Sequence, residues 1–245
     1  MKRILILSTC LLLVLTLILP EIVSAKSKQD KGPLSKKVFI HYRKPRGKPD
    51  NPGKPTKPPK DEGSYTYIAR GMKWKTAEDY VLNPLGAPAG SLAAIGKAMD
   101  TWDDEVSFTI FGALSQDDNV QVDLDPVGTD GANAIVFVPL GDPQIIAVTY
   151  VWGYYNAPPK FREIVEVDMI FNTGSDWTWG DADFDSTAMD VLNIATHEFG
   201  HAAGMGDLYE TPASEETMFG YSQEGEIKKR DLYIGDIAGI RNLYK

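Results

Sequence analysis

A histidine pair with an adjacent glutamate is the feature of this sequence best suited to chemistry. His197 and His201 are four residues apart, so on a helix their side chains lie on one face and both rings can reach one metal ion. Glu198 stands beside them, where it can hold a water molecule at the ion. Gly204 permits the helix to end through a left-handed turn, after which Asp207 can return as a third ligand. Two imidazoles, a carboxylate and a neighbouring base are what a zinc hydrolase needs.

Two other interpretations of these residues stay open. The first is an amphipathic helix whose histidines only make ordinary hydrogen bonds. It is disfavoured because two of the three histidines in the chain fall within one five-residue window. The third, His41, lies in a basic segment, and we expect a solvated side chain there. The second is a zinc site with a distant glutamate ligand, such as Glu224, but the spacing of Gly204 and Asp207 favours Asp207.

The stretch that holds the histidine pair resembles a known protease signature. Residues 197–207 resemble the metzincin zinc motif, with Asp207 where most metzincins have a third histidine. Metzincins also carry a methionine turn beneath the zinc, and residues 217–221 are similar to it, with Met218 in the methionine position. Core packing is the alternative role for an isolated methionine, so this match counts only together with the zinc motif.

Two further segments resemble the matrixin branch of the metzincins. Residues 165–172 are similar to the matrixin strand that precedes the site helix, and residues 235–244 resemble the matrixin closing helix. Taken together, the similarities extend over residues 65–245. They imply a metzincin-like catalytic domain with a mixed twisted sheet, an active-site helix, a Met-turn and a C-terminal helix.

The resemblance implies a zinc endopeptidase. Zinc would be held by His197, His201 and Asp207, and Glu198 would be the general base that takes a proton from the attacking water. Peptide or protein substrates would lie extended along an exposed strand edge, for which residues 145–152 are the candidate.

Two other sets of site residues follow from the same resemblance. Tyr221 is a candidate for lining the side-chain pocket beside the cleavage point, and a core aromatic with a solvated hydroxyl is the alternative. Asp181, Asp183 and Asp185 lie in a stretch that loosely resembles a matrixin metal-binding segment. Clustered carboxylates suit calcium, and a solvated acidic loop is the alternative.

The pattern of apolar residues predicts an α+β domain. Strands are expected over residues 65–70, 106–111, 134–138, 145–152 and 164–171, which are β-branched or aromatic-rich and bounded by turn formers. Ser91 is the expected cap of a helix whose apolar side chains recur at helical spacing: Leu92, Ile95, Met99 and Trp102. A second helix is expected over residues 186–203, and a last one after Asp236 as its N-cap.

The N-terminal part of the chain predicts export. Residues 1–25 combine a basic start, an apolar run and a small-residue cleavage site, as in a secretory signal peptide, with cleavage after Ala25. An uncleaved membrane anchor is the alternative, although the apolar run is short for a spanning helix. The only cysteine, Cys10, lies within this signal, so the mature chain has neither a disulfide nor the pro-segment thiolate that often keeps matrixins latent.

The remaining sequence consists of a basic segment followed by an acidic one. Residues 26–60 hold twelve Lys or Arg against two Asp, a charge of +10, and are Pro- and Lys-rich. They are predicted to be a linker or short pro-segment preceding a catalytic domain over residues 61–245. With −9 on the whole chain and +1 on residues 1–25, that domain carries −20. Such a basic segment should fold back onto the acidic domain, and nucleic-acid binding is disfavoured.

These observations predict a secreted zinc-dependent endopeptidase. The alternative is a non-catalytic secreted module that uses zinc only to stabilise a binding surface. Structural zinc sites are usually closed by four protein ligands, whereas this sequence offers three together with a glutamate suited to act as a base. Membrane contact is expected only through an uncleaved signal, and the oligomeric state stays open.

Overall fold

The structure is a computed structural model that describes residues 31–44, 63–125, 127–174 and 176–245. Its strands are β1 (Ser35–Arg43), β2 (Glu78–Leu82), β3 (Phe111–Gln116), β4 (Ala134–Val138), β5 (Ile145–Gly153), β6 (Ile164–Asn172), β7 (Trp179–Gly180), β8 (Met189–Asp190) and β9 (Tyr221–Ser222). Its α-helices are α1 (Ser91–Asp103), α2 (Val191–Ala203) and α3 (Ile234–Leu243), and its short 3-10 helices are η1 (Pro159–Phe161), η2 (Thr211–Ala213) and η3 (Lys228–Arg230).

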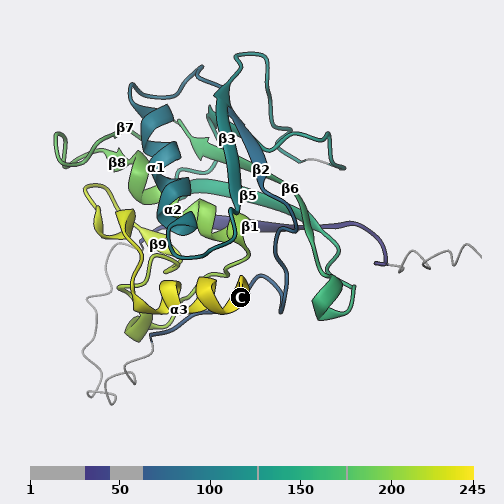
Figure 1. The fold of residues 1–245 in the computed structure, drawn as a ribbon. Helices are drawn as coiled ribbons and strands as arrows, with labels where there is room; N and C mark the ends of the chain where they lie inside the picture. Colours follow the sequence, from purple (N-terminus) through teal and green to yellow (C-terminus); the bar gives the residue numbers. More distant parts are fainter. Residues whose placement is uncertain (1–30, 45–62, 126, 175) are drawn as a thin grey trace, which may run out of the picture. The chain divides into compact units, whose positions relative to one another are not determined.

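The large sheet is mixed and has seven strands in the order β3-β2-β4-β6-β5-β1-β9 (Figure 1). Strand β5 runs antiparallel to both of its neighbours, β6 and β1. The other paired strands of this sheet are parallel. Strands β4, β5 and β6 are buried along most of their length, which explains their nearly continuous apolar sequences.

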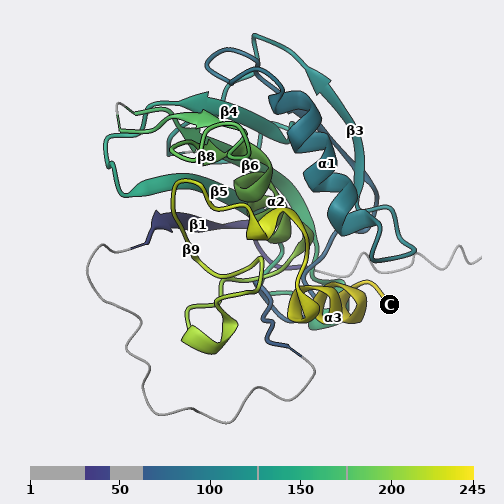
Figure 2. The ribbon, with the colours of Figure 1, turned by 90° about the vertical axis from the view of Figure 1, so that its left-hand side faces the viewer.

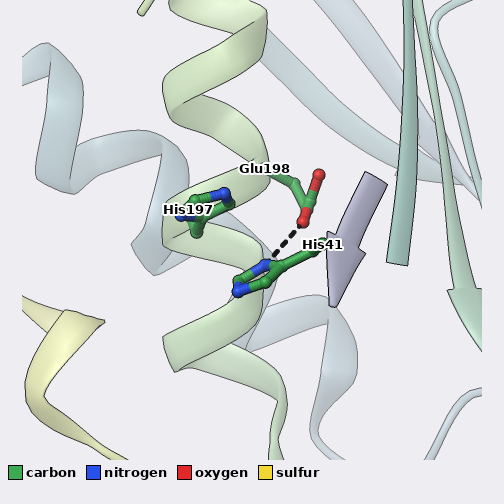
Figure 3. Close-up of side chains that lie close together, drawn as sticks. All are labelled: His41, His197 and Glu198. Atoms are coloured by element: carbon green, nitrogen blue, oxygen red, sulfur yellow. Dashed lines mark hydrogen bonds and ion pairs between the residues drawn. The ribbon is translucent and has the colours of Figure 1, made fainter. Parts of the chain in front are cut away.

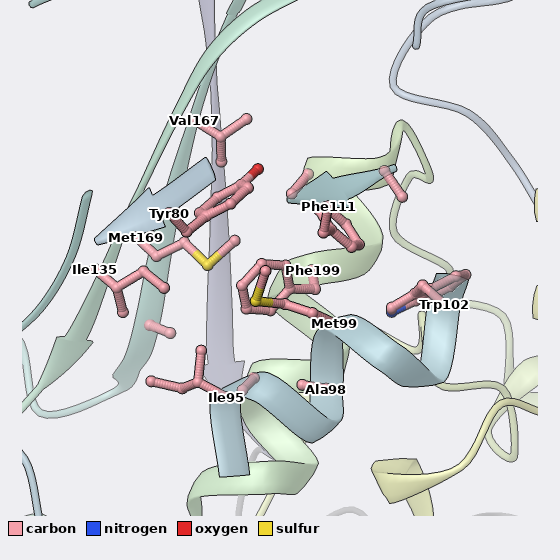
Figure 4. Packing of buried hydrophobic residues seen from close by; sticks show 14 of the residues in the cluster. Tyr80, Ile95, Ala98, Met99, Trp102, Phe111, Ile135, Val167, Met169 and Phe199 are labelled. Atoms are coloured by element: carbon pink, nitrogen blue, oxygen red, sulfur yellow. The ribbon is translucent and has the colours of Figure 1, made fainter. Parts of the chain in front are cut away.

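Helices α1 and α2 pack together on the sheet (Figure 2). The main hydrophobic core lies between them and the strands. Phe199 of α2 meets Tyr80 and Phe111 edge-on, at ring distances of 5.2 and 5.0 Å (Figure 4). The indole nitrogen of Trp102 in α1 donates to the carbonyl of Thr196 in α2, at 2.7 Å. These contacts hold α2 at a defined position, and the predicted α+β class is confirmed.

Both ends of α2 are set by local sequence. The Asp190 carboxylate accepts the backbone N–H of Asn193 at 2.7 Å, which satisfies a free donor of the first turn. Gly204 ends the helix with φ of 105°, a left-handed conformation that favours glycine. A side chain on Gly204 would also meet the carbonyl of Met72. The helix therefore stops where the chain must turn back towards its own histidines.

Three predicted strands agree with the structure and two are wrong. The predicted strands at 134–138, 145–152 and 164–171 correspond to β4, β5 and β6. Residues 65–70 form no strand, because Tyr67 makes only an isolated bridge to Met205. The strand predicted at 106–111 begins only at Phe111 and runs to Gln116. The preceding backbone is tied to α1 instead, since the Asp103 carboxylate accepts the N–H of Ile110.

All three predicted helices form, with different starts. Helix α1 begins at Ser91, but its N-cap is Gly90; the Ser91 hydroxyl instead donates to the Pro88 carbonyl. Helix α2 begins five residues after the predicted start at 186, because residues 181–188 form turns that place Asp190 as the cap. In α3 the aspartate predicted as N-cap, Asp236, is the third helical residue and accepts the N–H of Tyr233.

Strand β1 was not predicted. It lies within the basic segment, which we expected to be a linker or short pro-segment. The compact unit extends from Lys31 to Lys245, and β1 pairs with β5 along the edge that we expected to be exposed. That expectation for residues 145–152 is therefore wrong in this structure. The boundaries predicted after residues 25 and 60 lie outside the described residues, as does the signal peptide. Within the described part of the chain, no helix is long and apolar enough to span a bilayer.

Candidate metal centre

The two histidines and Asp207 converge at the C-terminal end of α2. One carboxylate oxygen of Asp207, Oδ1, lies 3.2 Å from Nε2 of His197 and 3.4 Å from Nε2 of His201. The three potential ligand atoms all lie within 4.8 Å of one another. Both histidines are buried. The structure thus brings together the three residues predicted as ligands, across the turn that Gly204 makes.

Hydrogen bonds orient both imidazoles. Nδ1 of His197 lies 2.7 Å from the carbonyl of Thr217, and Nδ1 of His201 lies 3.0 Å from the carbonyl of Met205. A carbonyl oxygen can only accept, so each Nδ1 carries the hydrogen and each Nε2 presents a lone pair. Fixing the tautomer through the far nitrogen is the usual arrangement for a metal-binding histidine.

The donor atoms fit a cation. Among the described residues, Nε2 of His197 and Oδ1 of Asp207 are buried without a hydrogen-bond partner, although they lie close together. Two acceptors that face each other at this distance repel unless a cation lies between them. Burial, with help from Lys229, lowers the pKa of His197 to about 4, which keeps its lone pair available.

Tyr209 supports Asp207 and was not found by sequence reasoning. Its hydroxyl donates to the second carboxylate oxygen of Asp207, at 3.1 Å. The backbone between them is also fixed, because the N–H of Leu208 donates to the carbonyl of Met218 at 2.8 Å. Tyr209 occupies the second oxygen and leaves Oδ1 facing the histidines. No spacing rule identified it, because the contact depends on the shape of the loop.

The predicted Met-turn lies directly beneath the site helix. Met218 is fully buried, and a side chain on Gly200 of α2 would meet its sulfur. The Asp236 carboxylate in α3 accepts the N–H groups of Thr217 and Met218, at 2.6 and 3.2 Å. Burial raises the pKa of Asp236 to about 7. The closing helix therefore holds the turn whose Thr217 carbonyl orients His197.

Glu198 lies beside the ligands with both oxygens engaged. Oε2 accepts from the hydroxyl of Thr149 on β5 at 2.5 Å, and Oε1 lies 3.0 Å from Nδ1 of His41 on β1 (Figure 3). Burial raises the pKa of Glu198 to about 7, within the range that suits proton transfer near neutral pH. Thr149 was not found from the sequence, because it is a strand residue whose pairing with the helix is long-range.

The prediction that His41 is solvated is wrong. Its side chain is only 1 % exposed, and its ring lies 3.9 Å from that of His197. Nε2 of His41 lies 3.2 Å from the ammonium group of Lys229, which can only donate, so Nδ1 carries the hydrogen and donates to Glu198. Both nitrogens of His41 are thereby used, because Nδ1 donates to Glu198 and the lone pair on Nε2 accepts from Lys229.

The calcium prediction is not supported. Arg230 lies among the acidic side chains and pairs with Asp181 at 2.6 Å, with Asp183 at 2.5 Å, and with Asp190. Asp185 accepts instead from the hydroxyl of Thr187 at 2.6 Å. The guanidinium group thus occupies the place among these carboxylates that a metal ion would need.

Tyr221 and Glu224 lie near the centre but outside the group of ligand atoms. Tyr221 is half-buried in β9, and its ring meets the ring of Tyr209 edge-on at 5.5 Å. Its role as a pocket residue stays a prediction. Glu224 forms an ion pair with Arg43. Among the described residues, Asp207 therefore joins the two histidines and Glu224 does not.

Comparison with known families agrees with this arrangement. The family model described as matrixin, a peptidase family, matches residues 88–245. The match includes α2, the Asp207 loop, the Met-turn and α3, but it does not include β1. No curated protein matches the chain.

Proposed function

The chain belongs to the matrixin family of metalloproteases, and from this premise we propose that it is a secreted zinc endopeptidase. His197, His201 and Asp207 are the proposed zinc ligands, and Glu198 is the proposed general base. The observation that carries the proposal is the convergence of two oriented Nε2 lone pairs on Oδ1 of Asp207, two of these atoms being buried without a hydrogen-bond partner. Three protein ligands leave a coordination position open, as in catalytic zinc sites.

The proposed reaction is hydrolysis of a peptide bond. A bound zinc ion would supply Lewis acidity, which lowers the pKa of water and polarises the carbonyl. Glu198 takes a proton from the water whose oxygen attacks the carbonyl carbon. It then gives that proton to the amide nitrogen as the carbon–nitrogen bond breaks, so that an acid and an amine leave. Thr149 positions Glu198 through its 2.5 Å hydrogen bond, and Tyr209 positions Asp207.

Two finer parts of the proposal rest on the sequence. Export rests on the signal-like residues 1–25, and the purified secreted chain should begin at Lys26 or later. An intact mass that retains these residues would favour a membrane-anchored protein instead. A role for Tyr221 in the substrate pocket is supported by its place in β9, next to the strand that lies over the site.

The decisive experiment separates base from ligand. In Glu198→Gln the side chain keeps its size but cannot take a proton, so zinc content should stay at one ion per chain while turnover of a peptide library falls about 100- to 10,000-fold. Thr101→Ser, on the exposed face of α1, is the matched control and should change neither quantity. If the parent chain binds zinc but hydrolyses no peptide, even when the metal site is open to solvent, the non-catalytic binding module would be favoured.

A further inference from the structure

Strand β1 lies where an extended peptide would have to lie to reach Glu198. It pairs antiparallel with β5 from Ser35 to Tyr42, and then parallel with β9, where Tyr42 and Arg43 face Tyr221 and Ser222. Strands β5 and β9 therefore form the two walls of a groove that β1 fills. Backbone pairing of this kind is sequence-tolerant, since any extended chain can satisfy the same edges.

The side chains of β1 cover the candidate site. Phe39 stacks on His201 with ring centroids 4.2 Å apart, and His41 lies against His197 at 3.9 Å. His41 also donates to Glu198 (Figure 3). An aromatic ring thus covers each of the two histidine ligands, and the base is hydrogen-bonded to a side chain where the reaction requires a water molecule.

Charge holds β1 in the groove. Lys31 pairs with Glu163 before the strand, Lys36 with Asp125 within it, and Arg43 with Glu224 at its end. In each pair the basic residue comes from the segment of charge +10 and the acidic residue from the rest of the domain. The basic segment therefore folds back onto the acidic domain, as the charge distribution predicts.

We propose that the groove between β5 and β9 is a peptide-binding site whose occupant is the chain's own residues 35–43, so that the described form is latent. This inference rests on the proposed function, because latency has meaning only for an enzyme. It requires no cysteine. The family match begins at residue 88 and includes neither β1 nor β2. His41 is in this view a blocking residue and not a metal ligand.

Residues 35–43, supplied as a separate peptide, can test whether the groove binds peptides. The probe is a fluorescein-labelled peptide of residues 35–43, and its binding is measured by anisotropy on the full-length, zinc-loaded chain carrying Glu198→Gln. That background keeps an acceptor for His41 but cannot cut the peptide. A tethered strand competes at an effective concentration in the millimolar range. Adding Phe39→Ala and His41→Ala should therefore tighten peptide binding by more than about tenfold.

Matched controls make the result specific. Val38 is 46 % exposed on the other face of β1, so adding Val38→Ala should leave peptide binding unchanged. A probe that itself carries alanine at both positions keeps only the backbone pairing, so it should bind the double variant more weakly than the unchanged probe does. Equal affinity of parent and double variant, with an intact thermal transition, would overturn the proposal.

A second measurement does not depend on the variants. At 1 mM peptide, amide exchange of residues 35–43 in the full-length chain should accelerate more than tenfold while exchange in β6 stays constant; no acceleration would also overturn the proposal. Hydrolysis is scored separately, because binding without turnover refutes the proposed function and leaves the groove assignment standing. In the chain with Glu198 intact, His41→Ala should raise peptide hydrolysis at least tenfold. A fall would instead make His41 a positioning residue.

Discussion

Carboxylates lie at both ends of helix α2, and the groups that they contact differ between the two ends. At the start, Asp190 joins Asp181 and Asp183 around the guanidinium of Arg230. At the end, Asp207 faces two imidazoles that present lone pairs rather than N–H groups. The first cluster already contains a positive charge, whereas in the second Oδ1 of Asp207 faces two acceptor nitrogens.

This difference shows that the partner, and not the number of carboxylates, decides whether a cluster suits a metal. Three aspartates close in sequence pointed to calcium, yet an arginine from η3 lies among them. A single aspartate with two oriented histidines makes the better cation site. The helix dipole acts in the same direction, because anions are favoured at the N-terminus and a cation at the C-terminus.

Removal of Asp207 should have the largest effect on this comparison. Asp207→Ala deletes one of three proposed ligands. Loss of a partner that only orients a ligand already costs about 10- to 100-fold in metal affinity, so we expect about a 1,000-fold loss of zinc affinity, or about 4 kcal/mol. Competition with a chelator measures it. Asp207→His should retain part of the affinity, because imidazole is also a zinc ligand.

Asp181→Ala is the matched control for that loss, since it removes a carboxylate from the other end of α2 and should leave zinc affinity unchanged. Zinc binding by Asp207→Ala that equals the parent would place the third ligand elsewhere, with Glu224 as the next position to change.

Loss of Arg230 should have the next largest effect. Arg230→Met leaves Asp190, which is 1 % exposed, without its charge partner. Breaking a fully buried ion pair costs about 3–5 kcal/mol, and we expect about 2–3 kcal/mol because Asp181 and Asp183 remain half exposed. Denaturant unfolding measures the free energy. Arg241→Met, which breaks a pair with Glu105 in which the arginine side chain is 62 % exposed, should cost less than about 1 kcal/mol. Equal losses in both variants would remove the distinction.

Replacing the same arginine by alanine offers a way to turn its cluster into a metal site. In Arg230→Ala three carboxylates face one another without a cation, and oxygen ligands of this kind suit calcium. Calcium at ten times its dissociation constant should then stabilise the variant by about 1.4 kcal/mol. Thermal unfolding with and without calcium measures it. The parent should show no such shift, and a calcium-insensitive variant would show that the cluster lacks ligand geometry.

The smallest effect is expected at the rim of the arginine cluster. Asp183 keeps more than half of its side chain exposed, so water already solvates its charge. Asp183→Asn should change the free energy of unfolding by less than about 1 kcal/mol, as is usual for exposed ion pairs. A loss as large as that of Arg230→Met would mean that the pair with Asp183, and not that with Asp190, carries the stability of the cluster.

Sequence reasoning was most accurate where one element contains the whole signal. Strands β4, β5 and β6 are apolar runs bounded by turn formers, so their positions could be read directly. It was least accurate at element starts. The start of α2 depends on Asp190, which caps the helix and binds Arg230 forty residues later. Strand β1 was missed although Val38, Phe39 and Ile40 form a short apolar run, because Lys- and Pro-rich sequence surrounds it. Its stability in the sheet comes from β5 and from ion pairs.

The local arrangement of the site follows from the sequence alone. The four-residue spacing of His197 and His201, the adjacent Glu198 and the turn at Gly204 follow from helix geometry, which fixes near neighbours without help from the rest of the chain.

The partners that those groups contact depend on how the chain folds. Thr149 and His41 reach Glu198 from strands far away in the sequence, and Arg230 reaches Asp181 in the same way. The physical reason is that hydrogen bonds and ion pairs act over a few ångströms in space. Their partners are therefore set by how sheet, helices and loops pack together, and not by spacing along the chain.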